Sequence, residues 1–229
     1  MVDMVQAIIM ELDILPIKYD SEYILLSNPD VIVEENTIGE LERFLKTNQN
    51  YVIAAPFMLN SDGERQLNTA FRITTELDYI LSFEIIWSKY ISKTFYKNIL
   101  SERGNFKQVD GVSGSLLMMD THKMLKYGMY DENIFLYCEE LSLAIKLKKI
   151  GMKTALLPEQ SFIHNHSVSI SKTYHSELKK HKLLVKSKLY VIKYYYKASP
   201  VMYVFAWIMS RLSLTEIFVW SLFHRIKAK

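Results

Sequence analysis

The chain has 229 residues, of which 49% are hydrophobic and 23% are charged, and this balance excludes a generally disordered polypeptide. Its single cysteine, Cys138, excludes an internal disulfide and a zinc site built on several cysteines, and it suits a reducing compartment. The net charge of +3 is unevenly spread, because residues 178–229 carry 11 bases and one acid while the rest of the chain is acidic. A basic tail on an acidic body predicts an anionic partner for the tail.

Apolar runs and helical patterns alternate over the first 175 residues. We expect strands within 22–33 and at 51–59, 109–120 and 152–158, helices at 34–46, 121–127 and 139–151, and an irregular helical stretch at 74–98. Strands that alternate with helices predict an α/β fold in which helices cover both faces of a sheet. Since no Pro/Gly-rich linker precedes residue 170, we expect one domain over residues 1–175.

The character of the sequence changes after residue 175. Residues 176–229 predict a helical tail in which lysines alternate with aromatic and aliphatic side chains. The uncharged run 198–210 is shorter than the ~20 residues of a spanning helix, and Arg211 and Glu216 follow it. The apolar side chains, tryptophans and positive charge of this tail together predict a helix that lies in a membrane interface. A C-terminal helix that packs on its own domain or binds a partner protein would have the same pattern.

Two adjacent acids, Glu139 and Glu140, stand at the start of the helix expected over 139–151. With about 100° per residue, Glu140 falls within the apolar arc of the helix, whereas Glu139, Ser142 and Lys146 fall on the wet side. An inward carboxylate is unfavourable unless it is paired or lines a cleft. The alternative is an ordinary acidic helix start, favoured by the helix dipole.

Asn28-Pro29-Asp30 follows the first apolar run. Ligands of open α/β sheets collect at the carboxyl ends of strands, where an aspartate can hold Mg²⁺ or Mn²⁺. The same tripeptide is also an ordinary turn.

Two further groups could line a site. His164 and His166 stand two residues apart after the last predicted strand, and one of them facing a cleft is a simpler interpretation than a pair of metal ligands. Gly111 and Gly114 would let a ligand approach the backbone closely, although a β-bulge would look the same.

Taken in order, these segments resemble the family 2 glycosyltransferases, particularly their rhamnosyltransferase-like branch. The resemblance runs from about Tyr23 to Ser169, through YILLSNPDVIVEENTIGELERFL, MLNSDGERQ and the stretch 109–169, which is its most specific part. It implies a GT-A-like mixed sheet flanked by helices, and an enzyme that uses a dTDP- or UDP-sugar with Mg²⁺ or Mn²⁺.

The resemblance also implies roles for individual residues. Asp30 stands in the family's metal motif, so it would hold the cation on the donor diphosphate, and His164 matches a histidine near that diphosphate. Glu140 falls on the catalytic base, and Gly114 lies in the acceptor-side strand. The residues implied to line the site are Asn28, Asp30, Gly114, Glu139, Glu140 and His164, with Asp30 and His164 nearest the metal.

The chain departs from the family pattern in several places. Glu140 is one methylene longer than the usual Asp, Ser142 replaces an Asp, and Lys146 replaces an Arg whose bidentate contact a lysine cannot reproduce. The family's first strand and its Asp-rich segment have no counterpart before Tyr23. We therefore expect the first βαβ half of the nucleotide-binding sheet to be absent from this chain.

The function that the resemblance implies is an inverting transfer of a sugar, such as rhamnose, to a lipid-linked saccharide in bacterial cell-surface polysaccharide synthesis. The first residues, MVDMVQAIIMELD, carry acids where a secretory signal carries bases, so we expect a cytoplasmic protein peripheral to the inner face of the cell membrane. The alternative is a chain inactive by itself, either a truncated product or half of a split transferase whose partner chain supplies the other half. A nucleic-acid-binding module is less favoured, because the acidic body opposes it and the apolar tail suits lipid better.

Overall fold

The computed structural model describes residues 21–83, 93–134, 136–164 and 177–227. These residues form two compact units, whose segments interleave along the chain. The first unit contains 21–73, 94–133 and 139–164; the second contains 74–83 with Lys93, 134 and 136–138, and 177–227.

The first unit is built on a mixed sheet with the strand order β1-β7-β3-β8-β2, and a further strand, β5, also pairs with β8. The strands are β1 (Tyr23–Ser27), β2 (Val31–Val33), β3 (Tyr51–Leu59), β5 (Lys107–Val109), β7 (Leu116–Asp120) and β8 (Lys153–His164). Within this sheet β3 and β8 are parallel and the other described pairs are antiparallel. Two short strands, β4 (Ala70–Phe71) and β6 (Gly111–Val112), pair separately.

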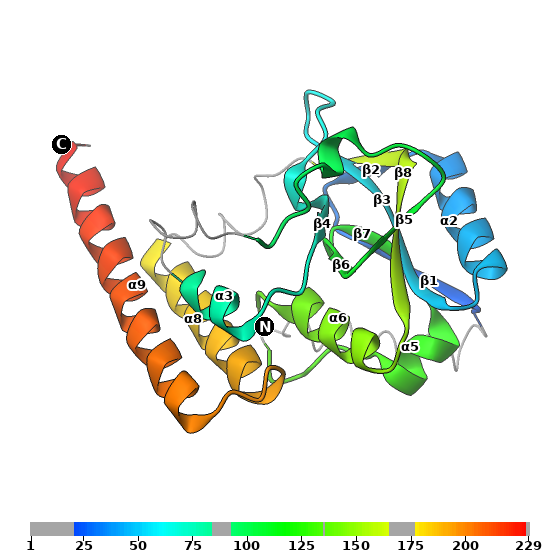
Figure 1. Ribbon diagram of the computed structural model, residues 1–229. Helices are drawn as coiled ribbons and strands as arrows, with labels where there is room; N and C mark the ends of the chain where they lie inside the picture. Colours follow the sequence, from blue (N-terminus) through cyan, green and yellow to red (C-terminus); the bar gives the residue numbers. More distant parts are fainter. Residues whose placement is uncertain (1–20, 84–92, 135, 165–176, 228–229) are drawn as a thin grey trace. The chain divides into compact units, whose positions relative to one another are not determined.

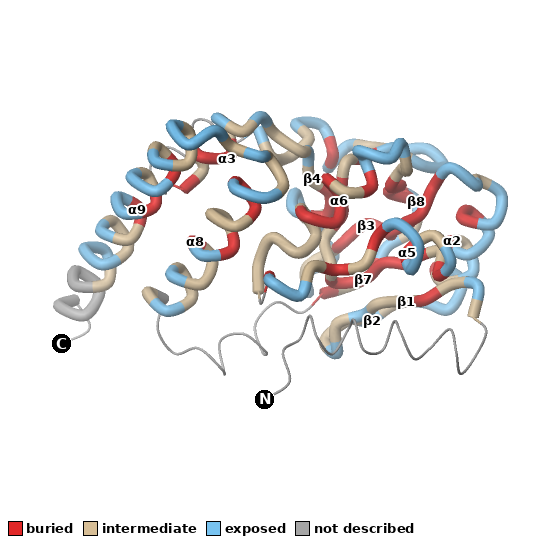
Figure 2. Tube along the Cα trace, turned by 90° about the horizontal axis from the view of Figure 1, so that it is seen from below, coloured by how far each residue is buried: buried red, intermediate tan, exposed pale blue. Residues whose placement is uncertain are grey.

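Helices α2 (Glu35–Thr47), α5 (Thr121–Tyr127) and α6 (Glu139–Lys149) cover this sheet, and the 3₁₀ turns are η1 (Leu67–Thr69) and η2 (Ile99–Ser101). Side chains alternate along the strands, so Ala54 packs in a cluster with α2 whereas Ile53 packs in the cluster that contains Leu143 and Leu147 of α6. Both faces are therefore buried, which explains why β3 is an unbroken apolar run (Figure 2). The predicted mixed α/β fold is confirmed.

The structure changes three predicted strands. The region 109–120 is not one strand, because it contains the end of β5, then β6 and then β7. The region 22–33 contains two strands, because Asn28-Pro29-Asp30 makes a turn between β1 and β2. The strand predicted to end at Pro158 instead continues to His164. Its register against β3 jumps from Leu157 to Ser161, so Pro158 lies in a bulge, where a missing backbone N–H is tolerated.

The irregular helix predicted at 74–98 is largely wrong where the structure describes it. Helix α3 (Glu76–Leu81) is short, residues 94–98 are not helical, and 84–92 lie outside the described residues. Thr75 begins α3 by accepting a hydrogen bond from the Asp78 N–H. The helix ends at Ser82, whose backbone N–H donates to the Asp78 carbonyl.

The second unit consists of α3, α8 (Glu177–Tyr194) and α9 (Pro200–Lys227). Lys188 Nζ donates to the carbonyl and to the hydroxyl of Ser82, at 2.8 and 2.9 Å. Burial lowers the pKa of Lys188 to about 8, because an ammonium is poorly solvated between the rings of Tyr79 and Phe83. The tail thus packs with earlier segments of the chain through a buried polar contact.

Candidate active site

The first group of predicted residues meets at the end of β8. Val31 of β2 pairs with His164, so the turn before β2 brings Asp30 beside the imidazole. His164 Nε2 lies 3.2 Å from Asp30 Oδ1 and 3.4 Å from Asn28 Nδ2, and the His164 side chain is buried. Residues far apart in the sequence therefore converge as the motif order predicts. His166 lies outside the described residues.

The chemistry of this group fits a divalent cation that is shared with a ligand. Asp30 offers a carboxylate, Asn28 an amide oxygen and His164 an imidazole nitrogen, within one hydrogen-bonded cluster. Among the described residues no group of three or more His, Cys, Asp or Glu side chains could hold a metal alone. A cation here would complete its coordination with water and phosphate oxygens, as Mg²⁺ commonly does.

The second group centres on Glu140 in the first turn of α6. Its Oε1 accepts a hydrogen bond from the Gly114 N–H at 3.2 Å. Burial raises the pKa of the Glu140 carboxyl, and hydrogen bonds from its own N–H and from that of Gly114 offset part of this effect. Glu140 therefore points inward, and its burial raises the proton affinity of the carboxylate.

Tyr130 lies beneath this carboxylate. A cavity of about 10 Å³, enough for about one water molecule, is lined by Glu140, Tyr130, Thr154 and Leu143. Burial raises the pKa of Tyr130, and the nearby charges of Glu140 and Glu139 raise it further. The phenol is thus a neutral hydroxyl in the interior next to the inward carboxylate. Nothing in the sequence pattern around Tyr130 indicated this position.

A short segment connects the two groups. The Asn28 N–H donates to the Ser115 carbonyl at 2.9 Å, and the neighbouring Gly114 contacts Glu140. The hydroxyls of Ser113 and Ser115 lie 3.0 Å apart. Residues 113–115 therefore contact both Asn28 and Glu140, so this segment links the two groups.

The backbone that leads into α6 is strained. Tyr137 and Cys138 have φ values of 65° and 69°, in the left-handed region that L-residues other than Asn and Asp rarely adopt. Each such residue costs about 1–3 kcal/mol and persists only where surrounding contacts hold it. Two such residues in succession stand directly before Glu139 and Glu140, so the backbone at this helix start is held by its surroundings.

The wet face predicted for α6 is wrong in part. Ser142 is fully buried and donates to the Glu139 carbonyl at 2.8 Å, and Glu139 is half-buried. Lys146 is half-buried and donates to the carbonyls of Met129 at 2.7 Å and Gly128 at 3.3 Å. The stretch 128–130 contacts this side of the helix, and a helical wheel cannot include a loop from elsewhere in the chain.

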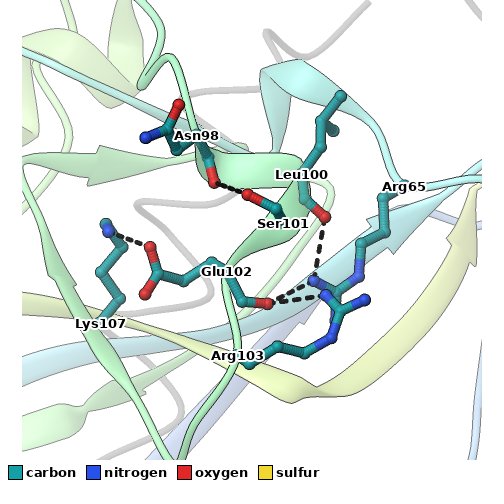
Figure 3. A network of polar contacts seen from close by, with 7 residues as sticks. All are labelled: Arg65, Asn98, Leu100, Ser101, Glu102, Arg103 and Lys107. Atoms are coloured by element: carbon teal, nitrogen blue, oxygen red, sulfur yellow. Dashed lines mark hydrogen bonds and ion pairs between the residues drawn. The ribbon is translucent and has the colours of Figure 1, made fainter.

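Arg65, inside the segment MLNSDGERQ, has a structural role that sequence reasoning missed. Its guanidinium donates to the carbonyls of Glu102 at 2.6 Å and Leu100 at 3.3 Å (Figure 3). It also donates to the Pro158 carbonyl at 2.6 Å. The same group stacks over the Phe57 ring at 4.4 Å. Arg65 thereby connects two loops to the bulge of β8. Lys107 pairs with Glu102 in the same network.

The raised pKa of Glu140 predicts a pH-dependent effect on stability. Because the folded state disfavours the ionised carboxylate, Glu140→Gln should raise the melting temperature at pH 8, where wild-type Glu140 must be charged in the unfolded chain. A gain of about 1 kcal/mol corresponds to about 2–4 °C for a chain of this size. The difference in melting temperature should shrink towards pH 5, where protonation of the Glu140 carboxylate is less unfavourable.

Calorimetric scans across this pH range measure the difference, and the exposed Glu42→Gln in α2 is the control. An equal melting temperature at every pH would contradict a buried Glu140 carboxylate.

Comparisons with known proteins identify similarity to glycosyltransferases. No protein-family model matches the chain. Over 146 residues the chain is 23% identical to rhamnosyltransferase WbbL of Escherichia coli (strain K12), and the match covers 63% of this chain and 53% of that protein. The chain thus spans about half the length of this curated relative. A crystal structure of GalNAc-T7 with UDP, GalNAc and Mn²⁺ superimposes with a TM-score of 0.48 at 12% identity, covering 70% of this chain and 31% of that one.

Proposed function

We propose that this protein is a glycosyltransferase that moves a sugar from a nucleotide-sugar to an acceptor hydroxyl with inversion of configuration. The observation that carries the proposal is the link, through residues 113–115, between the cluster of Asn28, Asp30 and His164 and the Glu140–Gly114 pair. The 23% identity to a rhamnosyltransferase supports the same reaction class.

Glu140 is the general base of the proposed reaction. It takes the proton of the acceptor hydroxyl while that oxygen forms a bond to the anomeric carbon, and the bond from this carbon to the diphosphate breaks. The Gly114 N–H orients the carboxylate, and burial raises the proton affinity of the carboxylate.

Asn28, Asp30 and His164 form the donor side of the proposed site. Mg²⁺ or Mn²⁺ bound there would neutralise the charge of the departing diphosphate. The Asn28 amide can in addition donate a hydrogen bond to a phosphate oxygen, and the contact between Asp30 and His164 Nε2 holds the imidazole in place. Glu139 completes the donor-side set that we propose. A dTDP- or UDP-sugar, for example of rhamnose, is the proposed donor.

The proposed acceptor is a lipid-linked saccharide at the inner face of the cell membrane. The basic and apolar composition of residues 178–229 supports an acceptor in that location. A second candidate is a transferase that needs another chain for donor binding. The position of β1 favours it, because in the described part of the sheet β1 pairs on one side with β7 and its other edge has no strand.

Calorimetric titration of the purified chain with dTDP- and UDP-sugars, with and without Mn²⁺, tests the proposal. Metal-dependent binding of a donor, followed by release of the nucleoside diphosphate with a lipid-linked acceptor, is the expected result. A folded chain that binds no nucleotide would contradict donor binding by this chain alone. Co-purification of a second polypeptide that restores binding would then favour the second candidate.

Gly114→Ala should impair transfer without unfolding the protein. A Cβ at Gly114 would lie 2.8 Å from Glu140 Oε1, which is the end of a flexible side chain and can move away. The displaced base would cost about 10²-fold in kcat, since catalysis is sensitive to misplacement of about 1 Å. Turnover and a melting curve measured together check this. An equal loss of folding and of activity would instead assign Gly114 a purely structural role.

A further inference from the structure

Helix α9 exposes its large apolar side chains and buries small ones. The exposed positions include Val201, Val204, Trp207, Ile208, Leu212, Phe218, Val219 and Trp220, each at 46% or more. Ala206, Ser210 and Ser213 are fully buried. A helix at the surface of a protein in water has the opposite pattern, with large apolar groups inside. Small residues between helices with large apolar ones outside are typical of helices in lipid (Figure 2).

The serine and threonine hydroxyl groups of α9 are hydrogen-bonded within the unit. Ser210, Thr215 and Ser221 each donate to the carbonyl three residues earlier, at 2.6, 2.6 and 2.8 Å. Ser213 donates to the Phe83 carbonyl at 2.7 Å. Such bonds let Ser and Thr enter an apolar surrounding without an unpaired donor. Arg211 lies over the Trp207 ring, at 4.9 Å from its centroid, as a side chain at an interface can.

The neighbouring helix α8 carries an exposed basic stripe. Lys179, Lys182, Lys186 and Lys193 are all exposed and follow a helical spacing. His181 bonds to Ser213 at 2.5 Å, and Lys193 lies over the Tyr203 ring at 5.9 Å, so the two helices run antiparallel and side by side (Figure 1). Lysines next to an apolar stripe suit anionic lipid headgroups above acyl chains.

We infer that α9 lies in the plane of a membrane and that one of its faces contacts anionic phospholipid. This face, named here the lipid face, consists of Val201, Val204, Ile208, Leu212 and Val219. By length and composition alone Pro200–Ser221, 22 residues, could cross a bilayer. If α9 crossed the bilayer, the antiparallel α8 beside it would enter the hydrocarbon as well. The lysines of α8 would then lie among acyl chains, where ammonium groups are strongly unfavourable. An in-plane α9 leaves those lysines among the headgroups.

This inference rests on the membrane location in the proposed function and deepens it. Its test uses no nucleotide, so the membrane contact of α9 and the sugar transfer can be contradicted independently. The experiment is co-sedimentation of the full chain with vesicles of phosphatidylcholine, with and without phosphatidylglycerol. The triple variant Val204→Ser, Ile208→Ser, Leu212→Ser should lower the partition coefficient about tenfold or more, because it removes the apolar contacts. Replacing Lys179, Lys182, Lys186 and Lys193 by Gln should remove the preference for phosphatidylglycerol and its salt sensitivity.

A matched control makes the result specific. Leu67, Leu125 and Ile150 are exposed at 42%, 38% and 46% in the first unit, and their triple replacement by Ser should leave vesicle binding unchanged. Vesicle binding that survives loss of the lipid face overturns the inference. A lipid-free dimer that the lipid-face variant converts to a monomer would also overturn it, since the face would then join two copies of the chain.

Labelling in cells separates the in-plane from the crossing arrangement. In a Cys138→Ser background, which removes the one native cysteine, single cysteines are placed at Ser199 and Ser221, before and within α9. If α9 lies in plane at the inner face, a membrane-impermeant maleimide should label neither position in intact spheroplasts and both after lysis. Labelling of one position before lysis would show that the helix crosses and would overturn the in-plane arrangement.

Discussion

Replacing Glu140 with Gln should reduce sugar transfer about 10²–10⁴-fold in kcat, the usual contribution of a general base. The amide keeps the size of the side chain, and its oxygen can still accept from the Gly114 N–H, so the loss isolates proton transfer. The wild-type rate should rise with pH through the raised pKa of Glu140, because the base is the ionised form. Initial rates at saturating donor, measured from pH 5 to 8, provide both results.

Two further variants show whether a loss of activity in Glu140→Gln comes from the missing base. Glu140→Asp keeps a carboxylate one methylene shorter, so it should retain more activity than Gln and show a shifted pH profile. Glu42→Gln removes an exposed charge on α2 and should change neither rate nor profile. Full activity in Glu140→Gln would contradict the assignment of the base, and the half-buried Glu139 would be the next residue to test.

Asp30→Ala should weaken Mn²⁺-dependent binding of the nucleotide-sugar about 10- to 100-fold. Contacts of a charged group contribute about 1.5–3 kcal/mol each, and Asp30 is the carboxylate of the Asn28–His164 cluster. Binding measured without metal should change much less, because the effect passes through the cation. Titration calorimetry at several Mn²⁺ concentrations separates these two quantities.

The control for Asp30 is another aspartate in a turn. Asp62 is exposed in the turn after β3, and Asp62→Ala should bind donor and metal like the wild type. Asp30→Asn keeps the shape of the side chain and should fall between wild type and Asp30→Ala. If Asp30→Ala lowered the metal-free affinity to the same extent, Asp30 would position the turn instead of a cation.

The sequence predicted those parts of the fold in which local pattern and tertiary burial agree. The strand at 51–59 and the helices after Glu34 and Asp120 have apolar faces that match the sheet surfaces they contact, and all are present. The Asp120 side chain also caps its helix by accepting from the Lys123 N–H. The helix prediction for 74–98 was wrong because the apolar residues of this stretch follow no single period. The described part of the stretch makes mainly tertiary contacts.

The candidate site was predictable only in its residue types. Motif order indicated Asn28, Asp30, Glu140 and His164, and the inward angle of Glu140 followed from helical periodicity. The contact between Lys146 and Met129 and the position of Tyr130 were not predictable, because they depend on the loop after α5. Arg65 was missed for a related reason, since its partners are backbone carbonyls, which sequence patterns do not record.

The bulge at Pro158 in β8 acts as a spacer between two halves of one strand. Leu157 pairs with Pro56 and Ser161 with Phe57, so three residues of β8 are looped out against a single step of β3. Side chains alternate along the strand after the bulge, and the number of looped residues decides whether His164 or its neighbour Ile163 faces Asp30. A slip of one residue in the register after the bulge would thus exchange an imidazole for a hydrocarbon beside Asp30, while the first halves of both strands stay paired. The register that the bulge sets in this way decides which side chain of β8 stands at the candidate site.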